Sequence, residues 1–350
     1  MARIETRVSV SGLKRQITIV GGGLAGLSLG IALRRRDVPV TVIEAGSYPR
    51  HRVCGEFISG VTRETLESLG IEQVFEGAVA PRTLAWYDHD RVVHRDELPE
   101  PAIGLSRHAL DDRLQRMFTS HGGVLRSGER AKPAPADGHV WAAGRKPQPG
   151  SWIGLKAHVR GVSPSADLEM HVGSNGYAGV STVEDGWWNV CGLFRIDKDL
   201  ARRDGRMLLA YLSAGGNTKL AERLSEAEWR DGSECAVAGF RLGRQRPLRG
   251  LPCIGDAESM IPPFTGNGMS MAFEAAETAC PWLASWHAGQ SSWRDVSEEI
   301  RISLRKRFHR RLSAAMWLHR GFFSAPVREL VRALSKEGLL PFRPMLSLVR

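Results

Sequence analysis

Residues 16–44 of the chain, QITIVGGGLAGLSLGIALRRRDVPVTVIE, decide its fold. The apolar start, 16–20, predicts a short buried strand, and the Ala/Leu-rich segment 24–36 has the spacing of a helix. Residues 38–44 are apolar again and predict a second strand. A strand, a glycine turn, a helix and a second strand make a βαβ unit, whose two strands are parallel. The sequence therefore predicts an α/β fold with a Rossmann-like parallel sheet near its N-terminus.

The glycine turn of this unit fits the pattern G-x-G-x-x-G, with Gly21, Gly23 and Gly26 at the required places. In that pattern the first glycine makes the tight turn, the second lets the backbone approach a pyrophosphate, and the third lets the helix pack on the strand. Glu44 closes the second strand about 20 residues further on, where an acid can bind the ribose hydroxyls of an adenosine. The dinucleotide site that we predict also includes Leu24, Ala25 and Ala45. A glycine-rich turn that binds nothing is the alternative interpretation.

A second stretch, far along the chain, has residue types that suit the other half of a dinucleotide. Residues 252–257, PCIGDA, predict a strand that ends at Asp256, and residues 262–269, PPFTGNGM, lead into a predicted helix at 268–283. Asp256 at a strand end can accept hydrogen bonds from a sugar-like polyol, although an Asx-turn at the start of a loop is the alternative. The glycines before the helix direct backbone N–H groups toward an electron-rich group.

Together these stretches resemble the p-hydroxybenzoate-hydroxylase-type FAD-dependent oxidoreductases, nearest the geranylgeranyl-reductase-like branch. In that superfamily the Gly-Asp-Ala motif binds the ribityl chain of FAD, and the Pro-x-Thr-Gly-x-Gly segment lies against the isoalloxazine ring. The resemblance implies FAD contacts for Gly255, Asp256, Pro263, Gly266, Asn267, Gly268 and Met269.

Three further matches extend this resemblance. Arg52, Cys54 and Gly55 match a basic residue and a Cys-Gly pair that reductase-like and halogenase-like members carry near the flavin. Arg107, in an Arg-x-x-Leu-Asp pattern, matches an arginine near the FAD phosphates, and residues 140–145 match the strand end that returns to the FAD domain. Simpler alternatives are a small buried hydrophobe for Cys54 and a solvated first-turn residue for Arg107.

The resemblance implies a Rossmann-like FAD-binding domain of the glutathione-reductase type, interleaved with an antiparallel β-sheet substrate domain and followed by a helical C-terminal region. We expect an FAD-binding domain made of residues 1–81, 106–150 and 241–290. The substrate domain is expected at 82–105 and 151–240, and a basic helical C-terminal region at 291–350. Sequence patterns predict helices at 61–70 and 106–121, the second capped by Ser106, antiparallel strands within 82–95 and 151–195, and short strands at 139–142 and 250–255.

The chain departs from the family's patterns where the reaction type would be decided. The hydroxylases' Asp-Gly motif has no clear counterpart around residues 140–162, so NADH, NADPH, an electron-donor protein and the substrate itself are all kept as possible electron sources. The reductases' Tyr-x-Trp-x-x-Pro strand reads here as 177–182, YAGVST, without its Trp and Pro. The halogenases' Trp-x-Trp-x-Ile-Pro motif is absent.

We expect the substrate to lie between the flavin and the antiparallel sheet. Candidate residues that orient or deprotonate it are Lys156, His158 and Tyr177, with Asn189 beside them. A histidine is the side chain whose ordinary pKa lies nearest neutrality, so His158 can relay a proton. The alternative for each is a residue on the outer face of a strand. Three functional hypotheses follow: an FAD-dependent monooxygenase acting on an aromatic, polyketide-like or other lipophilic molecule, a reductase of C=C bonds, and a non-catalytic flavin-binding protein.

The composition indicates the class of protein and its cellular location. Of 350 residues 42% are apolar and 25% charged, which is typical of a soluble globular protein. The first fifteen residues lack the apolar core of a signal peptide. The five cysteines are widely spaced with no CxxC pair, so we expect no metal site and a reducing cytoplasm.

The basic character of the chain is confined to its end. Residues 301–350 hold twelve Lys/Arg against two Asp/Glu, which accounts for the whole net charge of +10. Their mixture of basic and bulky apolar residues fits a helical cap over the FAD domain, or a peripheral contact with an anionic membrane. No nucleic-acid-binding motif accompanies the charge, so we expect no nucleic-acid partner.

Overall fold

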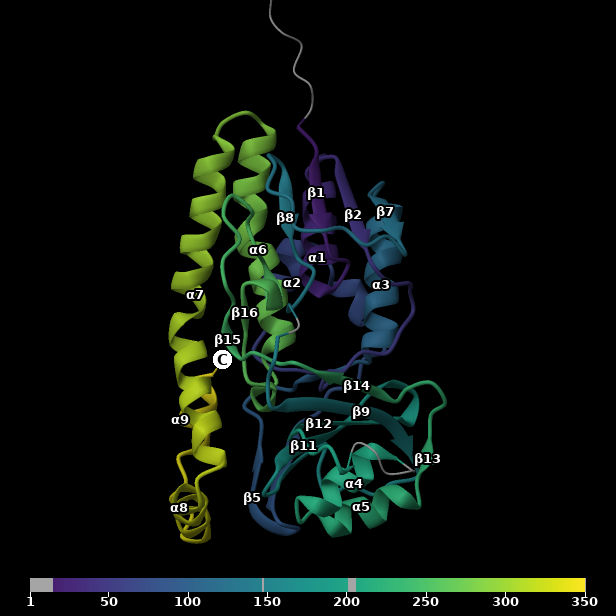
Figure 1. Ribbon diagram of the computed structural model, residues 1–350, viewed down its shortest axis with the longest axis vertical. Coiled ribbons are helices and arrows are strands. Elements are labelled where there is room, and N and C mark those ends of the chain that lie inside the picture. Colours follow the sequence, from purple (N-terminus) through teal and green to yellow (C-terminus); the bar gives the residue numbers. More distant parts are fainter. Residues whose placement is uncertain (1–14, 147, 201–205, 350) are drawn as a thin grey trace, which may run out of the picture.

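The computed structural model describes residues 15–146, 148–200 and 206–349, which form an upper and a lower part in Figure 1. Of the first fifteen residues, where no signal peptide is expected, only Arg15 falls within this range. The upper part contains a four-stranded parallel sheet in the order β7-β2-β1-β8. Its strands span Ile17–Val20 (β1), Val40–Glu44 (β2), Val124–Ser127 (β7) and His139–Trp141 (β8). The parallel βαβ unit predicted from residues 16–44 is confirmed.

Helices pack around the parallel sheet. Helix α1 (Leu24–Arg34) is buried along almost its whole length, because α2, α3 and α6 all pack against it. These helices span Arg63–Leu69 (α2), Arg107–Ser120 (α3) and Gly268–His287 (α6), close to their predicted positions. Ser106 caps α3 as predicted, since its Oγ accepts a hydrogen bond from the Ala109 backbone N–H at 3.1 Å. The helical predictions for the upper part are therefore confirmed.

The lower part is built on an eight-stranded sheet in the order β13-β9-β12-β11-β10-β4-β5, with β14 also paired to β9. Its strands span Thr83–Asp88 (β4), Arg91–Glu97 (β5), Trp152–Arg160 (β9), Leu168–Val172 (β10), Gly176–Thr182 (β11), Trp188–Arg195 (β12), Glu228–Trp229 (β13) and Cys235–Ala238 (β14). The predicted antiparallel pairing is confirmed except between β4 and β10, which run parallel. That exception arises because the two strands come from different segments of the chain, 82–105 and 151–240.

Two helices that the sequence patterns did not predict cover one face of the lower sheet. They are α4 (Met207–Ala214) and α5 (Thr218–Ser225), whose apolar side chains pack with alternate residues of β9. Ile153, Leu155 and Ala157 point to these helices. The intervening residues of β9 therefore point to the other face, toward the parallel sheet.

The expected strand at 250–255 is not a regular strand. Only Cys253 forms a bridge there, with Trp141 of β8. Pro252 has no N–H to donate to a ladder, and Gly255 turns the chain with a φ of +62°. The remaining short elements are β3 (Phe57–Ile58), β6 (Ile103–Gly104), β15 (Gly243–Arg244), β16 (Ser259–Met260) and the 3₁₀ turns η1 (Glu72–Phe75), η2 (Glu184–Gly186), η4 (Gly255–Ala257) and η5 (Pro263–Thr265).

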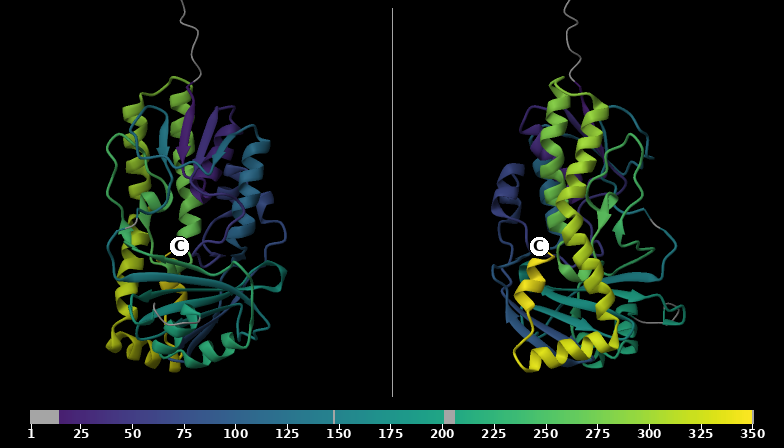
Figure 2. Two further views of the ribbon diagram at one scale, coloured as in Figure 1. Left: turned by 45° about the vertical axis from the view of Figure 1, so that its right-hand side comes forward. Right: turned by 90° about the vertical axis from the view of Figure 1, so that its left-hand side faces the viewer.

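The C-terminal region is helical, as predicted, and packs on the rest of the chain. Helix α7 (Trp293–Phe322) lies beside α6 and extends to the lower sheet, where α8 (Ala325–Lys336) and α9 (Phe342–Ser347) follow (Figures 1 and 2). Leu304, Phe308 and Leu312 of α7 are buried in the upper core. None of the helices in the described ranges is long and apolar enough to cross a membrane. Peripheral membrane contact through 301–350 stays a prediction.

Candidate active site

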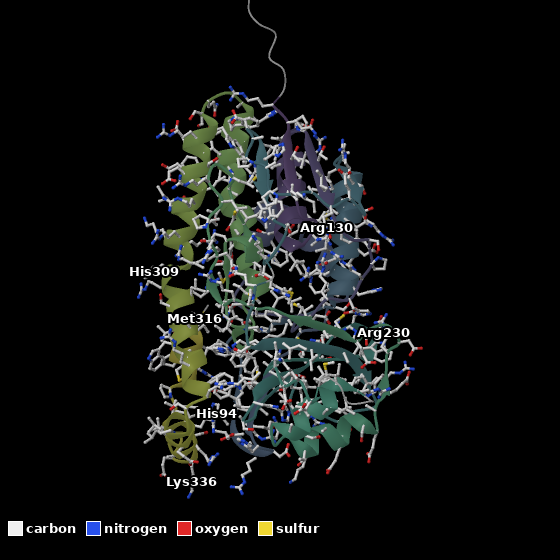
Figure 3. The ribbon with its side chains drawn as sticks, viewed as in Figure 1. His94, Arg130, Arg230, His309, Met316 and Lys336 are labelled. Carbon is white, nitrogen blue, oxygen red and sulfur yellow. The ribbon has the colours of Figure 1, made fainter. Side chains whose placement is uncertain are left out.

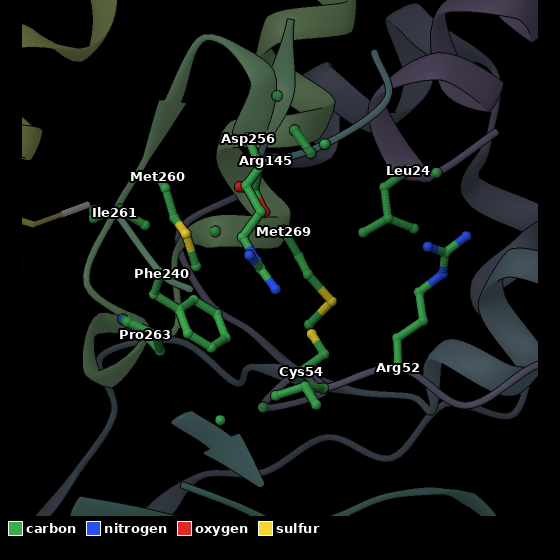
Figure 4. Close-up of a pocket in the computed structure, with 18 of the residues that line it drawn as sticks. Leu24, Arg52, Cys54, Arg145, Phe240, Asp256, Met260, Ile261, Pro263 and Met269 are labelled. Carbon is green, nitrogen blue, oxygen red and sulfur yellow. The ribbon is translucent and has the colours of Figure 1, made fainter. Parts of the chain in front are cut away.

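One cavity of about 1570 Å³ is lined by residues of both sheets. Among its lining residues are nearly all those expected to bind the cofactor: Gly21, Gly23, Leu24, Ala25, Glu44, Ala45, Arg52, Cys54, Gly55, Arg107, Gly255, Asp256, Pro263, Gly266, Gly268 and Met269. Figure 4 shows Leu24 and Arg52 on one side of it, Asp256 with Arg145 on another, and Cys54 with Met269 between them. Two stretches of sequence that lie far apart in the chain therefore meet around one space.

The glycine turn forms one end of the cavity. A Cβ at Gly26 would lie 1.9 Å from the carbonyl oxygen of Gly21, so close packing of α1 on β1 requires glycine there. Gly26 accordingly does not line the cavity. A Cβ at Gly23 would meet nothing within 4 Å, and no side chain caps the N-terminus of α1. The first backbone N–H groups of α1 are thus open to an anion in the cavity.

Glu44 holds this turn in place at the end of β2. Its carboxylate accepts hydrogen bonds from the backbone N–H groups of Gly22 at 2.7 Å and Gly46 at 2.9 Å, and from Arg50 at 2.5 Å. Only 8% of the side chain is exposed. The carboxylate therefore lies fixed at the edge of the cavity, beside the open N-terminus of α1.

Asp111 fixes two arginines at the cavity wall. Its fully buried carboxylate accepts from Arg107 Nε at 2.7 Å and NH2 at 2.9 Å, and from Arg52 Nε at 2.8 Å. Burial lowers the pKa of Arg107, but Asp111 outweighs it, so the pKa rises above its ordinary value. Arg107 is therefore not a solvated first-turn residue. The buried Nη2 of Arg52 makes no hydrogen bond among the described residues and lies 3.9 Å from Glu44 Oε2, so it can still donate to an anionic or carbonyl oxygen.

The second motif stretch forms the opposite part of the wall. Asp256 is in η4, where its side chain is exposed at the cavity wall near Arg107 and Arg145. Gly266 has a φ of +67° and turns the chain into the N-terminus of α6. Asn267 does not line the cavity, because its side chain is fully buried and donates to the Thr265 carbonyl at 2.8 Å. Its contribution is to the shape of the turn.

Lys156 and His158, expected to meet the substrate, do not line the cavity. Both are buried on the inward face of β9, where they bond the carboxylate of Glu56. Lys156 Nζ lies 2.9 Å from Glu56 Oε1, and His158 Nε2 lies 2.5 Å from Oε2. The Arg107 backbone N–H also donates to Oε1 at 2.8 Å. Glu56 therefore joins the lower sheet to the start of α3.

The same sheet also holds the segment just before Glu56. Asn189 Nδ2 donates to the Cys54 carbonyl and Ser181 Oγ to the Gly55 carbonyl, both at 3.0 Å. Neighbouring strands β9, β11 and β12 thus fix residues 54–56, which line or border the cavity. The sheet positions this segment rigidly beneath the space that Cys54 and Met269 enclose.

Tyr177 is the one predicted substrate residue that lines the cavity. Burial raises the pKa of its hydroxyl, partly opposed by a hydrogen bond with the backbone of Phe264, so it stays protonated at neutral pH. His51 lines the cavity as well, and burial, with Lys156 nearby, lowers its pKa to about 3. A neutral imidazole and a neutral phenol therefore belong to residues of the cavity wall.

Three residues near this point have the composition of a metal site. Ligand atoms of His51, Glu56 and His158 lie within 4.8 Å of one another. Lys156 Nζ is bonded to two of these residues, at 2.9 Å from Glu56 and 3.2 Å from His51 Nδ1. Since a cation would be repelled by that ammonium group, the cluster is better explained as an internal ion pair.

Comparisons with known proteins agree with this architecture. The model of the pyridine nucleotide-disulphide oxidoreductase family matches residues 16–80. The structure is similar to the flavin-dependent brominase Bmp2, with a TM-score of 0.74 and 20% identity over 96% of this chain and 93% of that one. It is also similar to p-nitrophenol 4-monooxygenase PnpA from Pseudomonas putida DLL-E4, with a TM-score of 0.73 and 15% identity over 96% of both chains.

A third similar structure is a geranylgeranyl bacteriochlorophyll reductase-like protein from Thermoplasma acidophilum, with a TM-score of 0.71 and 17% identity over 96% of this chain and 95% of that one. No curated protein matches the sequence. At these identities the likeness establishes the fold. The Rossmann-like sheet, the second and mostly antiparallel sheet and the C-terminal helices expected from the resemblance are confirmed.

Sequence reasoning did not single out Glu56 or His51 as site residues. Both flank the Arg52–Gly55 match, so their position in the chain was a usable signal. Their roles depend on Lys156 and His158, about a hundred residues away, and no local pattern indicates such a pairing.

Proposed function

We propose that the chain is an FAD-dependent monooxygenase that hydroxylates an aromatic or otherwise lipophilic small molecule. One observation carries the proposal: a single cavity runs from the glycine turn of α1 to the lower sheet. A dinucleotide and a small substrate can therefore share one enclosed space. The similarity to structures described as a brominase and a p-nitrophenol monooxygenase supports the aromatic class of substrate.

The residues present fit FAD at the upper end of the cavity. We assign the pyrophosphate to the open N-terminus of α1 at Gly23, the adenosine ribose to Glu44, and the ribityl chain to Asp256. The Nη2 of Arg52, which makes no hydrogen bond among the described residues, and the N-terminus of α6 at Met269 are assigned to the polar edge of the ring system. When bound, the flavin would supply the redox chemistry, and the protein supplies position, electrostatics and exclusion of water.

The lower end of the cavity is assigned to the substrate. Tyr177 lines this end, but its hydroxyl oxygen is buried against the Phe264 backbone, so we assign its part in substrate binding to packing of the ring. His51 is neutral at physiological pH, and because its Nδ1 faces the Lys156 ammonium at 3.2 Å, its Nε2–H can donate a hydrogen bond there. We propose that Lys156 and His158 act as positioning residues through Glu56, since neither lines the cavity. Their predicted roles as substrate contacts are replaced by this one.

A flavin-dependent reductase of C=C bonds is the second candidate. The likeness to the geranylgeranyl reductase-like structure and the position of Cys54 at the cavity support it. We also propose the domain division given above, NADH, NADPH or a donor protein as electron source, and a cytoplasmic location, which the absence of disulfides among the described cysteines supports. A non-catalytic flavin-binding protein is the remaining alternative.

The deciding experiment uses purified protein and isotopically labelled oxygen. A monooxygenase should show a flavin absorption spectrum, consume oxygen with NADH or NADPH and a phenol, and place one labelled atom in the product. A reductase would consume the donor without labelled product. Flavin that stays oxidised with every donor would exclude both enzymes, and protein that binds no FAD would remove the cofactor assignment as well.

A further inference from the structure

The cavity is divided sharply by charge. All the Lys, Arg, Asp and Glu side chains that line it belong to residues 44–52, 107, 129–146, 246 and 256, on or next to the upper part. Within the described chain, no such residue lines it from β4, β10, β11, β12 or the C-terminal helices. The wall of this lower end, which we call the chamber, includes Leu84, Trp86, Leu168 and Met170 from the sheet, and Phe342 and Leu346 from α9.

Helix α9 is an integral part of the chamber. Phe342 is buried in a cluster with Phe57, Leu84 and Leu98, and Leu346 packs against this cluster. The Phe342 ring meets Trp86 edge to face, with centroids 5.9 Å apart. Phe57 follows directly after Glu56, so α9 touches both the lower sheet and the segment that the sheet holds.

Helix α8 anchors α9 in this position. Asp88 of β4 pairs with Arg332 at 2.5 Å and with Arg328 at 3.7 Å. His94 of β5 bonds Ser335 through Nδ1 at 3.0 Å, and Figure 3 shows it beside α8. Because these partners lie on adjacent strands, the C-terminal helices are fixed to the sheet that forms the opposite side of the chamber.

We propose that α9 is the specificity-determining wall of the substrate chamber, and that Phe342 and Leu346 restrict the substrate to uncharged, apolar aromatic molecules. An ionised carboxylate in this space would lose its hydration without gaining a cationic partner, which is strongly unfavourable. A phenol hydroxyl, in contrast, is uncharged and loses far less hydration free energy in the same space. This inference rests on the proposed function, because it takes the chamber as the place where substrate binds.

The test compares two probes that differ in one carboxylate, 2-naphthol and 6-hydroxy-2-naphthoate. Binding to the oxidised holoenzyme is measured by calorimetry, without an electron donor. We expect 2-naphthol to bind at least about 100-fold more tightly. Leu346→Arg should reverse or abolish this preference, since it places a guanidinium in the chamber. Leu348→Arg is the matched control, because Leu348 is 56% exposed just beyond α9, and it should leave both affinities unchanged.

Three results would overturn the inference: wild-type affinities within about threefold of each other, no measurable binding of 2-naphthol, or an unchanged preference in Leu346→Arg. The comparison of the two probes' affinities for the wild-type protein tests the inference even if Leu346→Arg does not fold. Turnover is measured separately. Selective 2-naphthol binding without oxygen consumption or hydroxylated product would support the chamber and refute the monooxygenase.

Discussion

Replacing Glu56 with glutamine is a direct test of the buried ion pair below the cavity. Neither the Glu56 nor the Lys156 side chain is exposed. Burial by itself raises the pKa of Glu56, but Lys156 and His158 outweigh it and lower the pKa from 4.5 to about 2. At about 1.4 kcal/mol per pH unit, this difference corresponds to ~3 kcal/mol of folding free energy at neutral pH.

We expect Glu56→Gln to lower the free energy of unfolding by about 3–5 kcal/mol, because the Lys156 ammonium is left buried without a counter-charge. The matched control is Glu67→Gln, whose partner Arg63 is 85% exposed, and its effect should stay below ~1 kcal/mol. Urea denaturation at pH 7, followed by tryptophan fluorescence, measures both. Adding Lys156→Met to Glu56→Gln should restore part of the loss, since the uncompensated charge is then gone.

The pH dependence gives an independent check. Since the pKa of Glu56 is lower in the folded state, the contribution of Glu56 to the free energy of unfolding is complete above pH 4.5. This contribution disappears as the pH falls toward 2. The stability gap between wild type and Glu56→Gln should therefore be constant from pH 6 to 8 and narrow below about pH 4.5. This account would be refuted if Glu56→Gln and Glu67→Gln lost equal amounts of stability. It would also be refuted if the stability difference between wild type and Glu56→Gln did not narrow in acid.

Three further variants test residues of the glycine turn and of the sheet that holds the cavity wall. Gly26→Ala should prevent stable folding, seen as lost cooperativity in thermal melts, because its Cβ would lie 1.9 Å from the Gly21 carbonyl oxygen. Gly23→Ala should fold normally but retain little FAD after purification, because its Cβ would occupy the open space at α1. Asn189→Ala should cost about 1 kcal/mol in urea denaturation and weaken FAD binding severalfold by fluorescence titration, because it frees the Cys54 carbonyl.

The predicted parts of the fold are those specified by local patterns. The βαβ unit, the capped helix at Ser106 and the alternating strands of 151–195 all follow from the periodicity of a few adjacent residues. The glycine turn was predicted for a similar reason: Gly26 packs on the Gly21 carbonyl within the turn, and Gly21 has a φ of +112°. The strand predicted at 250–255 was wrong because apolar composition alone did not account for Pro252.

The features that were not predicted arise from contacts between distant segments. Glu56 acquires its role from Lys156 and His158 across about a hundred residues, and the inward or outward face of β9 is set by α4 and α5. Those helices escaped prediction, and without them the two faces of the strand could not be told apart. Lys156 and His158 were predicted to contact the substrate, and the structure pairs both with Glu56 instead.

The buried charges around the cavity follow one arrangement. Asp111 pairs with Arg52 and Arg107, Arg52 also lies 3.9 Å from Glu44, and Glu56 pairs with Lys156, so each of these cations has a carboxylate beside it. Guanidinium groups can then face the phosphate end, while no unpaired charge reaches the chamber. A bound pyrophosphate would meet donors at Arg52 and the N-terminus of α1, whereas no Lys or Arg of the described residues lines the chamber to receive an anionic substrate. The same internal pairing that stabilises the loop at 54–56 thus also separates the polar cofactor end from the apolar substrate end.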